Sequence, residues 1–195
     1  MTDREEPRPL RADARRNRDR VLAAAQAAFA EEGISVPLDE IARRAGVGAG
    51  TVYRHFPTKE ALFQAAIVDR VERMITHARD LSTAPDPGRA FFDFLDSMVT
   101  EGGVKRDLAD AVGGHDSPGY LGPVRDLNAA ISELLTRAQQ SGAVRPDMDI
   151  TDLMRLLKGA FLAAHETGAT KEQRHRTFTI VFDGMRPHPQ PHLDR

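Results

Sequence analysis

The segment from Leu38 to Phe56 constrains the fold of this chain more than any other, because it has the pattern of two short helices joined by a tight turn. In its first half, apolar residues recur at helical spacing and form one stripe: Leu38, Ile41, Ala42 and Ala45. A second helical pattern begins shortly after this stripe ends. The segment therefore predicts a helix–turn–helix unit.

The first helix of this unit has a recognisable start and end. We expect Pro37 at the first helical position, where a missing N–H group costs nothing, with Asp39 and Glu40 in the first turn, where carboxylates suit the positive helix end. Gly46 follows the apolar stripe, where a left-handed residue commonly ends a helix. The tight turn comes next, with Val47 expected between the two helices.

The second helix is expected from Ala49 to Phe56, with one face turned inward and the other outward. Val52 and Phe56 lie four residues apart and should face inward. The outward face carries hydroxyl, guanidinium and imidazole groups and no acid: Thr51, Arg54 and His55, flanked by Ala49, Gly50 and Tyr53. Such a face suits a groove lined by phosphate oxygens, so it predicts DNA binding in the major groove.

The alternative is that these two helices are only a hairpin within a helical bundle. Two glycines, Gly48 and Gly50, stand near the start of the second helix. Glycine inside a helix costs up to about 1 kcal/mol relative to alanine. That cost is easier to explain if another molecule approaches the backbone closely, so the residues favour DNA binding over the hairpin.

A longer stretch, from Ile41 to Leu62, resembles the signature of the TetR family of transcriptional regulators. The pattern Tyr-x-His-Phe-x-x-Lys-Glu-x-Leu at its end is the most specific part, and the resemblance extends over roughly residues 14–75. It implies an all-α homodimer of about nine helices per chain. In this fold an N-terminal three-helix unit binds DNA, and the last two helices of a C-terminal bundle form the dimer.

Two positions depart from the pattern of the family. Pro37 and Leu38 stand where many members have a threonine, which removes a phosphate contact, and Gly48 stands where serine is common. The outward face and the resemblance together assign DNA contacts to Ala49, Gly50, Thr51, Tyr53, Arg54, His55 and Lys59. Because Gly48, Ala49 and Gly50 have almost no side chain, we expect little direct base readout.

Composition limits the other classes of function. The 195 residues suffice for one or two domains with a core, and the absence of cysteine excludes disulfides and thiolate metal sites. The net charge of −2 is not a nucleic-acid signal by itself. The N-terminus is polar, and no apolar run approaches the roughly 20 residues that span a membrane. These features predict a cytoplasmic protein without a membrane partner.

The chain is expected to divide into four parts. We expect a flexible arm at 1–13, a DNA-binding domain at 14–60 with its motif at 37–56, a ligand-binding and dimerisation domain at 61–186, and a tail at 187–195. Arginines slightly outnumber acidic residues at the N-terminus. The arm is therefore either a solvated tail or an extension that reaches phosphates or a minor groove of DNA.

Seven further helices are expected besides the two of the motif. An alanine-rich helix around Val21–Phe29 precedes it, and Thr58 is expected to cap a long helix that links the two domains. The other helices are expected around Phe91–Met98 and over Val104–Val112, Leu121–Gln140, Ile150–His165 (capped by Asp149) and Lys171–Gly184, with a loop at Gly113–Gly119.

Two further sites are expected in the C-terminal domain. A small-molecule effector is expected among mostly apolar groups, namely Phe91, Phe94, Met98, Tyr120, Phe161 and His165, although ordinary core packing explains each of them singly. The dimer interface is expected at Leu157, Ala160, Ala164, Phe178, Val181 and Phe182; the alternative is that these faces are buried within one subunit. A two-fold dimer on double-stranded DNA implies an operator with an inverted repeat.

No cofactor is expected. His115, Asp116, His188 and His192 lack the paired spacing of a zinc motif, and no nucleophile elbow, phosphate loop or carboxylate pair is visible. An enzyme is therefore not expected. The rival hypothesis is a helical adaptor that binds protein and uses the motif for packing.

Overall fold

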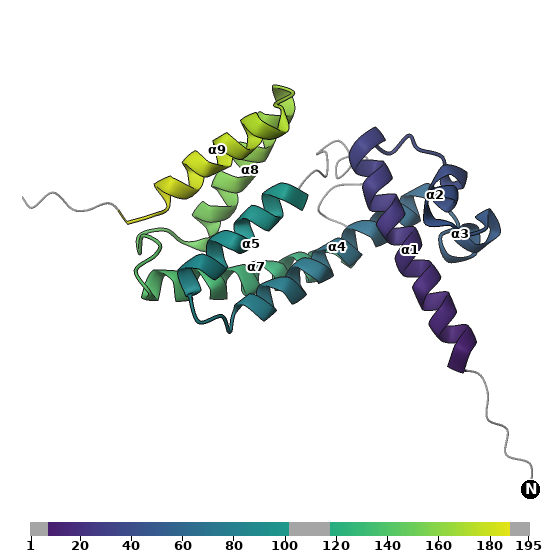
Figure 1. Cartoon of the computed structure of the whole chain (residues 1–195), viewed down its shortest axis with the longest axis horizontal. Helices are drawn as coiled ribbons and strands as arrows, with labels where there is room; N and C mark the ends of the chain where they lie inside the picture. The colour runs from purple at the N-terminus through teal and green to yellow at the C-terminus, as the bar shows by residue number, and fades with distance from the viewer. Residues whose placement is uncertain (1–7, 102–117, 188–195) are drawn as a thin grey trace, which may run out of the picture. The chain divides into compact units, whose positions relative to one another are not determined.

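The computed structural model describes residues 8–101 and 118–187, and these ranges contain eight helices and no strand (Figure 1). The all-α prediction is confirmed. The helices are α1 (Arg8–Glu32), α2 (Leu38–Ala45), α3 (Ala49–His55), α4 (Lys59–Leu81), α5 (Pro87–Glu101), α7 (Pro118–Gln140), α8 (Ile150–Glu166) and α9 (Lys171–Gly184). The helix expected at Val104–Val112 lies outside the described residues.

The chain forms two compact units, whose described parts are residues 8–70 and residues 71–101 with 118–187. The division falls within α4, which gives about half of its 23 residues to each unit. The sequence places this boundary at the start of the same helix instead. None of the described helices is long and apolar enough to cross a membrane.

Helix α1 begins at Arg8, within the segment 1–13 that is expected to form an arm, so residues 8–13 are helical. Alanine and arginine are strong helix formers, and they make up 14 of the 25 residues of α1. An ion pair between Arg16 and Asp13, one turn apart, supports the helix further. The helix expected around Val21–Phe29 lies within α1, and its apolar stripe is buried: Val21, Leu22, Ala25, Ala28 and Phe29.

The core of the first unit lies where α1, α2, α3 and the first half of α4 meet. Phe29 of α1 and Phe63 of α4 pack edge to face, with ring centroids 5.3 Å apart. The core also contains Ile41 of α2 and Val52 of α3, which are both fully buried. Burial on all four helices holds the two short ones in place, since isolated helices of this length are unstable in water.

Helix α4 begins as the sequence predicts. The backbone N–H of Ala61 donates to Thr58 Oγ1 at 3.1 Å, which makes Thr58 the N-cap. In the same unit, the side-chain amide of Gln26 on α1 donates to the carbonyl oxygen of Ala66 at 2.8 Å. This bond fixes the first half of α4 to α1.

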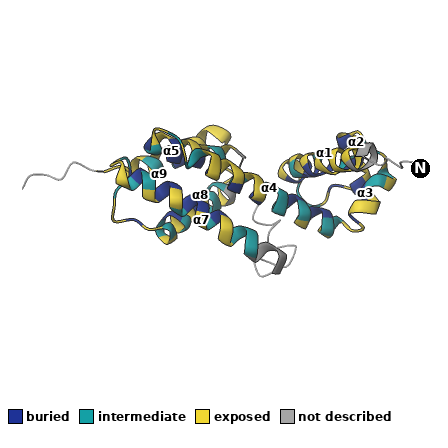
Figure 2. Ribbon diagram, turned by 90° about the horizontal axis from the view of Figure 1, so that it is seen from below, coloured by how far each residue is buried: buried dark blue, intermediate teal, exposed yellow. Residues whose placement is uncertain are grey.

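The second unit packs its apolar side chains between α5, α7, α8 and α9, along which Figure 2 marks the buried positions. Helix α7 starts at Pro118, within the expected loop and three residues before the expected Leu121. The start of α8 is as predicted, because the Asp152 N–H donates to Asp149 Oδ1 at 2.8 Å. Helix α9 spans the expected residues, and Thr170 caps it through a reciprocal capping box with Gln173.

Candidate DNA-binding surface

The start of α2 differs in one detail from the expectation. Pro37 is the N-cap, not the first helical residue, because its ψ of 146° is extended while its φ of −65° already fits a helix. Its carbonyl oxygen accepts hydrogen bonds from the N–H groups of Glu40 and Ile41, at 3.1 and 3.2 Å. Asp39 and Glu40 lie in the first turn as predicted. Proline contributes no side-chain cap here, so the carboxylates alone complement the helix end.

The turn between α2 and α3 is closed by a left-handed glycine. Gly46 has φ 62° and ψ 39°, as its place after the apolar stripe predicts. The N–H of Val47 donates to the carbonyl oxygen of Ala42 at 3.0 Å, and the Val47 side chain packs against the core as expected. Gly48, in extended conformation, is then the N-cap of α3.

Helix α3 presents one face to the core and the other to solvent. Val52 is fully buried and Phe56 is buried directly after the helix ends, as predicted. On the other side Gly50, Tyr53, Arg54 and His55 are exposed, while Ala49 and Thr51 are half-buried. No acidic residue lies on α3. The Arg54 Nε donates to the Gly50 carbonyl oxygen at 3.0 Å, which lays this side chain along the helix.

The two glycines at the start of α3 face open space. A Cβ atom built on Gly48 or Gly50 meets no heavy atom within 4 Å. Packing within the chain therefore does not require glycine at either position. Gly48 is the N-cap, a position that suits glycine, so the cost of glycine inside a helix applies to Gly50 alone. Close approach of another molecule explains that cost, as the sequence suggested for both glycines.

Lys59 stands at the start of α4, three residues after Phe56. Its side chain is half-buried, and Nζ donates to the carbonyl oxygen of Ser35 at 3.2 Å. An ammonium group has three donors, so this bond leaves others for an anion. The first turn of α4 also presents backbone N–H groups, which favour a phosphate at the same place.

Several N-terminal arginines have partners within the chain. Arg16 pairs with Asp13, and the Arg18 guanidinium lies over the Phe56 ring, 5.9 Å from its centroid. Arg20 Nη2 donates to the Ala45 carbonyl oxygen at 2.6 Å. The partners of Arg18 and Arg20 lie on other elements of the fold, so no local sequence pattern predicts these contacts.

An ion-pair network that the sequence analysis did not predict joins α2 to the end of α1. Arg44 bonds to Glu31 at 3.1 Å, to Glu40 at 2.8 Å and also to Glu32, and Arg43 bonds to Glu40 at 2.7 Å. Hydrogen bonds from Arg43, which has the larger effect, and from Arg44 lower the pKa of Glu40 to about 2. Bonds from Glu40 and Glu32 raise the pKa of Arg44. The network keeps these charges fixed on α2 across the neutral pH range.

The residues expected to bind an effector do not form one described cavity. Phe91 and Phe94 are fully buried, whereas Met98 and Phe161 are half-buried. Phe161 packs against Phe178 with ring centroids 4.5 Å apart, which is core packing. The side chains of Tyr120 and His165 lie outside the described part of the structure.

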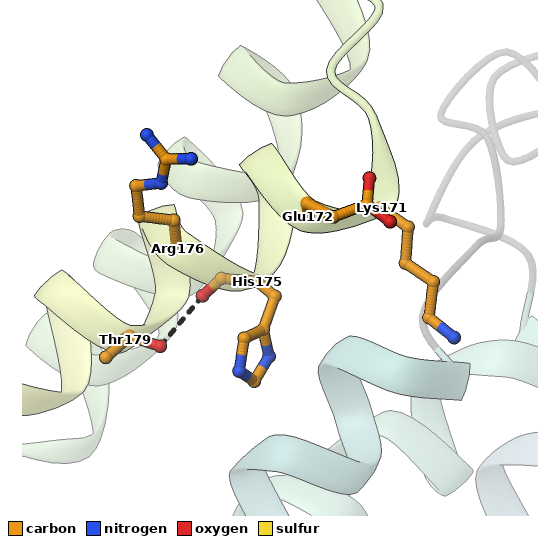
Figure 3. Close-up of a pocket in the computed structure, with 5 residues that line it drawn as sticks. All are labelled: Lys171, Glu172, His175, Arg176 and Thr179. Carbon is orange, nitrogen blue, oxygen red and sulfur yellow. Dashed lines mark hydrogen bonds between the residues drawn. The ribbon is translucent and has the colours of Figure 1, made fainter.

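A different hollow, of about 510 Å³, lies along the exposed side of α9 (Figure 3). Five side chains of this one helix line it: Lys171, Glu172, His175, Arg176 and Thr179. Thr179 Oγ1 donates to the His175 carbonyl oxygen at 3.0 Å, a bond within the helix. None of the expected effector residues lines this hollow.

The residues expected at the dimer interface are packed mainly within one chain. Leu157, Ala160 and Phe178 are buried in the single subunit, while Ala164, Val181 and Phe182 are half-buried. This is the packing that the sequence left open as the alternative. The large apolar side chains that these two helices expose are Leu156 on α8, at 47 %, and Ile180 on α9, at 67 %.

The four residues that lack the spacing of a zinc motif, His115, Asp116, His188 and His192, all lie outside the described residues. Within residues 8–101 and 118–187, no three histidine or acidic side chains are grouped so that they could hold a metal ion.

Comparison with known proteins gives matches over both units. Residues 21–66 match the family model of bacterial regulatory proteins of the tetR family, and residues 86–187 match that of the SbtR-like transcriptional regulator C-terminal domain. The HTH-type transcriptional regulator UidR of Escherichia coli K12 is 30% identical over 159 residues, covering 76% of this chain and 79% of UidR.

Two solved structures are similar over most of the chain. A TetR transcription regulatory protein from Mycobacterium vanbaalenii is 44% identical, with a TM-score of 0.72, covering 92% of this chain and 100% of that one. The TetR transcriptional regulator SCO0520 from Streptomyces coelicolor is 33% identical, with a TM-score of 0.74, covering 88% of this chain and 99% of that one.

Proposed function

This chain belongs to the TetR family of bacterial regulatory proteins and is a DNA-binding transcriptional regulator, and we propose that it is a ligand-responsive repressor that binds an inverted-repeat operator as a homodimer. A protein of this kind acts by occupying DNA rather than by catalysis. It works where the chromosome is, which in a bacterium is the cytoplasm.

The observation that carries the proposal is the outward face of α3. It is exposed, free of acids, and begins with two glycines whose missing side chains leave open space. A DNA groove fills such space with phosphates, sugars and base edges at close range. The adaptor hypothesis, which uses the motif for packing, gives Gly50 no purpose, since no described residue packs against the place of its missing side chain.

The exposed groups of α3 divide into two roles in this proposal. Thr51, Tyr53 and His55 contact phosphates or base edges, and Lys59 contacts a phosphate beside the start of α4. Ala49 and Gly50 let the helix approach the bases. The methyl groups of Ala49 and Thr51 suit the methyl of thymine, and Arg54 adds a further donor. Most of these contacts fix register, so sequence readout is sparse.

The dimer face that we propose uses the side chains left exposed on α8 and α9. Leu156, Gly159 and Ala163 recur at helical spacing and make one exposed stripe on α8. Gly159 has open space where a Cβ would stand, so a second helix can approach its backbone. Ile180 adds an exposed apolar group on α9, which packs against α8. A second copy of the chain would cover all four residues.

Such a dimer determines the form of the operator. Two copies of α3 related by a two-fold axis read two half-sites about 34–36 Å apart in successive major grooves, so the operator is an inverted repeat. An effector bound in the second unit would shift α4, which is shared by both units, and thereby change the separation of the two α3 helices. DNA affinity then falls because the half-sites are no longer met together.

The proposal is tested with DNA that flanks the gene for this protein. Fluorescence anisotropy with a duplex carrying an inverted repeat, compared with a scrambled duplex of equal length, should show specific binding that weakens steeply with salt. A set of duplexes selected from random sequence covers the case of a distant target. If no duplex in either set is bound in a salt-dependent manner, the adaptor hypothesis replaces this one.

A further inference from the structure

The side chain of Arg20 reaches from α1 into the turn between α2 and α3. Its Nε and Nη2 donate to the carbonyl oxygen of Ala45 at 3.0 and 2.6 Å, and Nη2 also donates to that of Gly46 at 2.6 Å. On the other side Nη1 lies 3.4 Å from Asn17 Oδ1, one turn away on the same helix. The guanidinium is thus held between α1 and the turn.

The acceptors of these bonds are groups that a helix leaves without partners. Ala45 is the last residue of α2, and the final carbonyls of a helix have no N–H group of their own helix to bond. They also form the negative end of the helix dipole, which favours a guanidinium. Arg20 therefore stabilises the end of α2 in two ways, by hydrogen bonds and by charge.

Gly46 and Arg20 fit each other. A Cβ atom on Gly46 would stand 2.7 Å from Arg20 Nη2, too close for both to remain in place. Glycine is therefore needed at position 46 for two reasons: its φ of 62° and the space that the Arg20 guanidinium occupies. Every other amino acid at position 46 would strain the backbone and displace Arg20.

A second arginine, Arg44, also connects the end of α2 to α1, at a different place along α1. Arg44 bonds to Glu31 and Glu32, which lie about 11 residues beyond Arg20, or roughly 16 Å along α1. Those ion pairs join side chains of the two helices. The side chain of Arg20, in contrast, bonds to the backbone of the turn itself, and α3 begins three residues after Gly46.

We propose that Arg20 is a positioning residue for DNA recognition, which sets the direction of α3 through the turn and does not contact DNA. The inference rests on DNA binding by α3. Because the start of α3 is Gly48-Ala49-Gly50, with little side chain to adjust, a small change in its direction cannot be absorbed by other rotamers. Loss of Arg20 should then cost specific contacts more than phosphate contacts.

The test compares Arg20→Met and Arg20→Lys in the full-length protein. The probes are a duplex that the wild-type protein selects from random sequence and a scrambled duplex of the same length. We expect Arg20→Met to bind the selected duplex at least about tenfold more weakly, a loss typical of one mismatched base pair. Binding to the scrambled duplex should change less than twofold, with an unchanged salt slope. Arg20→Lys should lie between, since an ammonium cannot bridge two carbonyls as a guanidinium fork does.

Lys59→Ala is the comparison variant, because a lost phosphate contact should weaken both duplexes and lower the salt slope by about one. If Arg20→Met behaves in that way, Arg20 is a phosphate contact and the proposal is wrong. It is equally wrong if Arg20→Met only lowers the melting temperature, while the folded protein keeps its full preference for the selected duplex. Should Arg20→Met not fold, the same preference measured for Arg20→Lys decides between these outcomes.

Discussion

Lys59 Nζ lies 3.2 Å from the carbonyl oxygen of Ser35, so the first residue of α4 is tied to the loop between α1 and α2. The same ammonium is the proposed phosphate contact. Replacing Lys59 by alanine should therefore weaken binding to all duplexes and reduce the slope of log affinity against log salt by about one unit. Titrations between 50 and 200 mM salt measure this slope. An unchanged slope would mean that Lys59 serves only its bond to Ser35.

Replacing Gly50 by alanine should affect stability and operator binding in opposite directions. Because a Cβ at this position meets nothing and the residue is helical, Gly50→Ala should raise the free energy of unfolding, by up to about 1 kcal/mol. The same methyl group should weaken operator binding, since it enters the space proposed for DNA. Chemical denaturation and anisotropy measure the two effects.

The matched control for Gly50 is Thr136→Ala in α7, an exposed helical position where alanine is likewise the better helix former. This variant should be stabilised in the same way and should bind the operator like the wild type. Equal operator affinity of Gly50→Ala and the wild type would contradict close approach of DNA at the start of α3.

The proposed dimer face predicts a folded monomer. Ile180 is 67 % exposed in the single chain, so Ile180→Glu should leave the helices intact while it places a charge in the interface. Light scattering should show the mass of one chain, and operator affinity should fall by at least about a hundredfold, because the two half-sites are no longer bound by one particle. Thr136→Glu, at an exposed position on α7, is the control and should remain a dimer. A dimeric Ile180→Glu would place the interface elsewhere.

Glu40 predicts a defined dependence of stability on pH. Its pKa is lowered from the ordinary value of 4.5 to about 2 in the folded protein by hydrogen bonds from Arg43 and Arg44. The folded state thus binds the proton less readily than the unfolded state. The resulting stabilisation is complete above about pH 4.5 and is lost as the pH falls toward 2. The difference in unfolding free energy between the wild type and Glu40→Gln should follow that course in denaturant titrations.

Asp147 offers a comparison in the other unit. Arg145 lowers its pKa to about 2 by a hydrogen bond, so Asp147→Asn should show a similar acid dependence of stability. Only Glu40→Gln should also weaken operator binding, because only Glu40 belongs to the network that holds α2. Equal operator affinity of the two variants would mean that the ion-pair network of Glu40 does not contribute to DNA recognition.

The parts of this fold that were predictable from the sequence are those governed by near neighbours. The cap of α8 at Asp149, the capped start of α4 at Thr58 and the left-handed Gly46 depend on residues within one turn, and the structure confirms each. The position of Pro37 was wrong by one residue. Proline has a φ that suits both the N-cap and the first helical position, and only ψ separates them.

The contacts that sequence analysis missed join residues far apart in the chain. Arg20 and Ala45 are separated by 25 positions, and no local pattern relates them. On α8 the difficulty was of another kind. Its apolar residues cover more than one face, so periodicity could not say which face packs inside the subunit and which remains exposed, as Leu156 does.

The sharing of α4 between the two units means that no slack chain connects them through this helix. A single inserted residue would advance everything beyond it by about 1.5 Å and rotate it by about 100° about the helix axis. Natural or engineered exchange of the second unit between regulators of this kind must therefore preserve helical phase as well as contacts. A flexible loop could accommodate a change in length, whereas a continuous helix requires that the number of residues at this junction be kept.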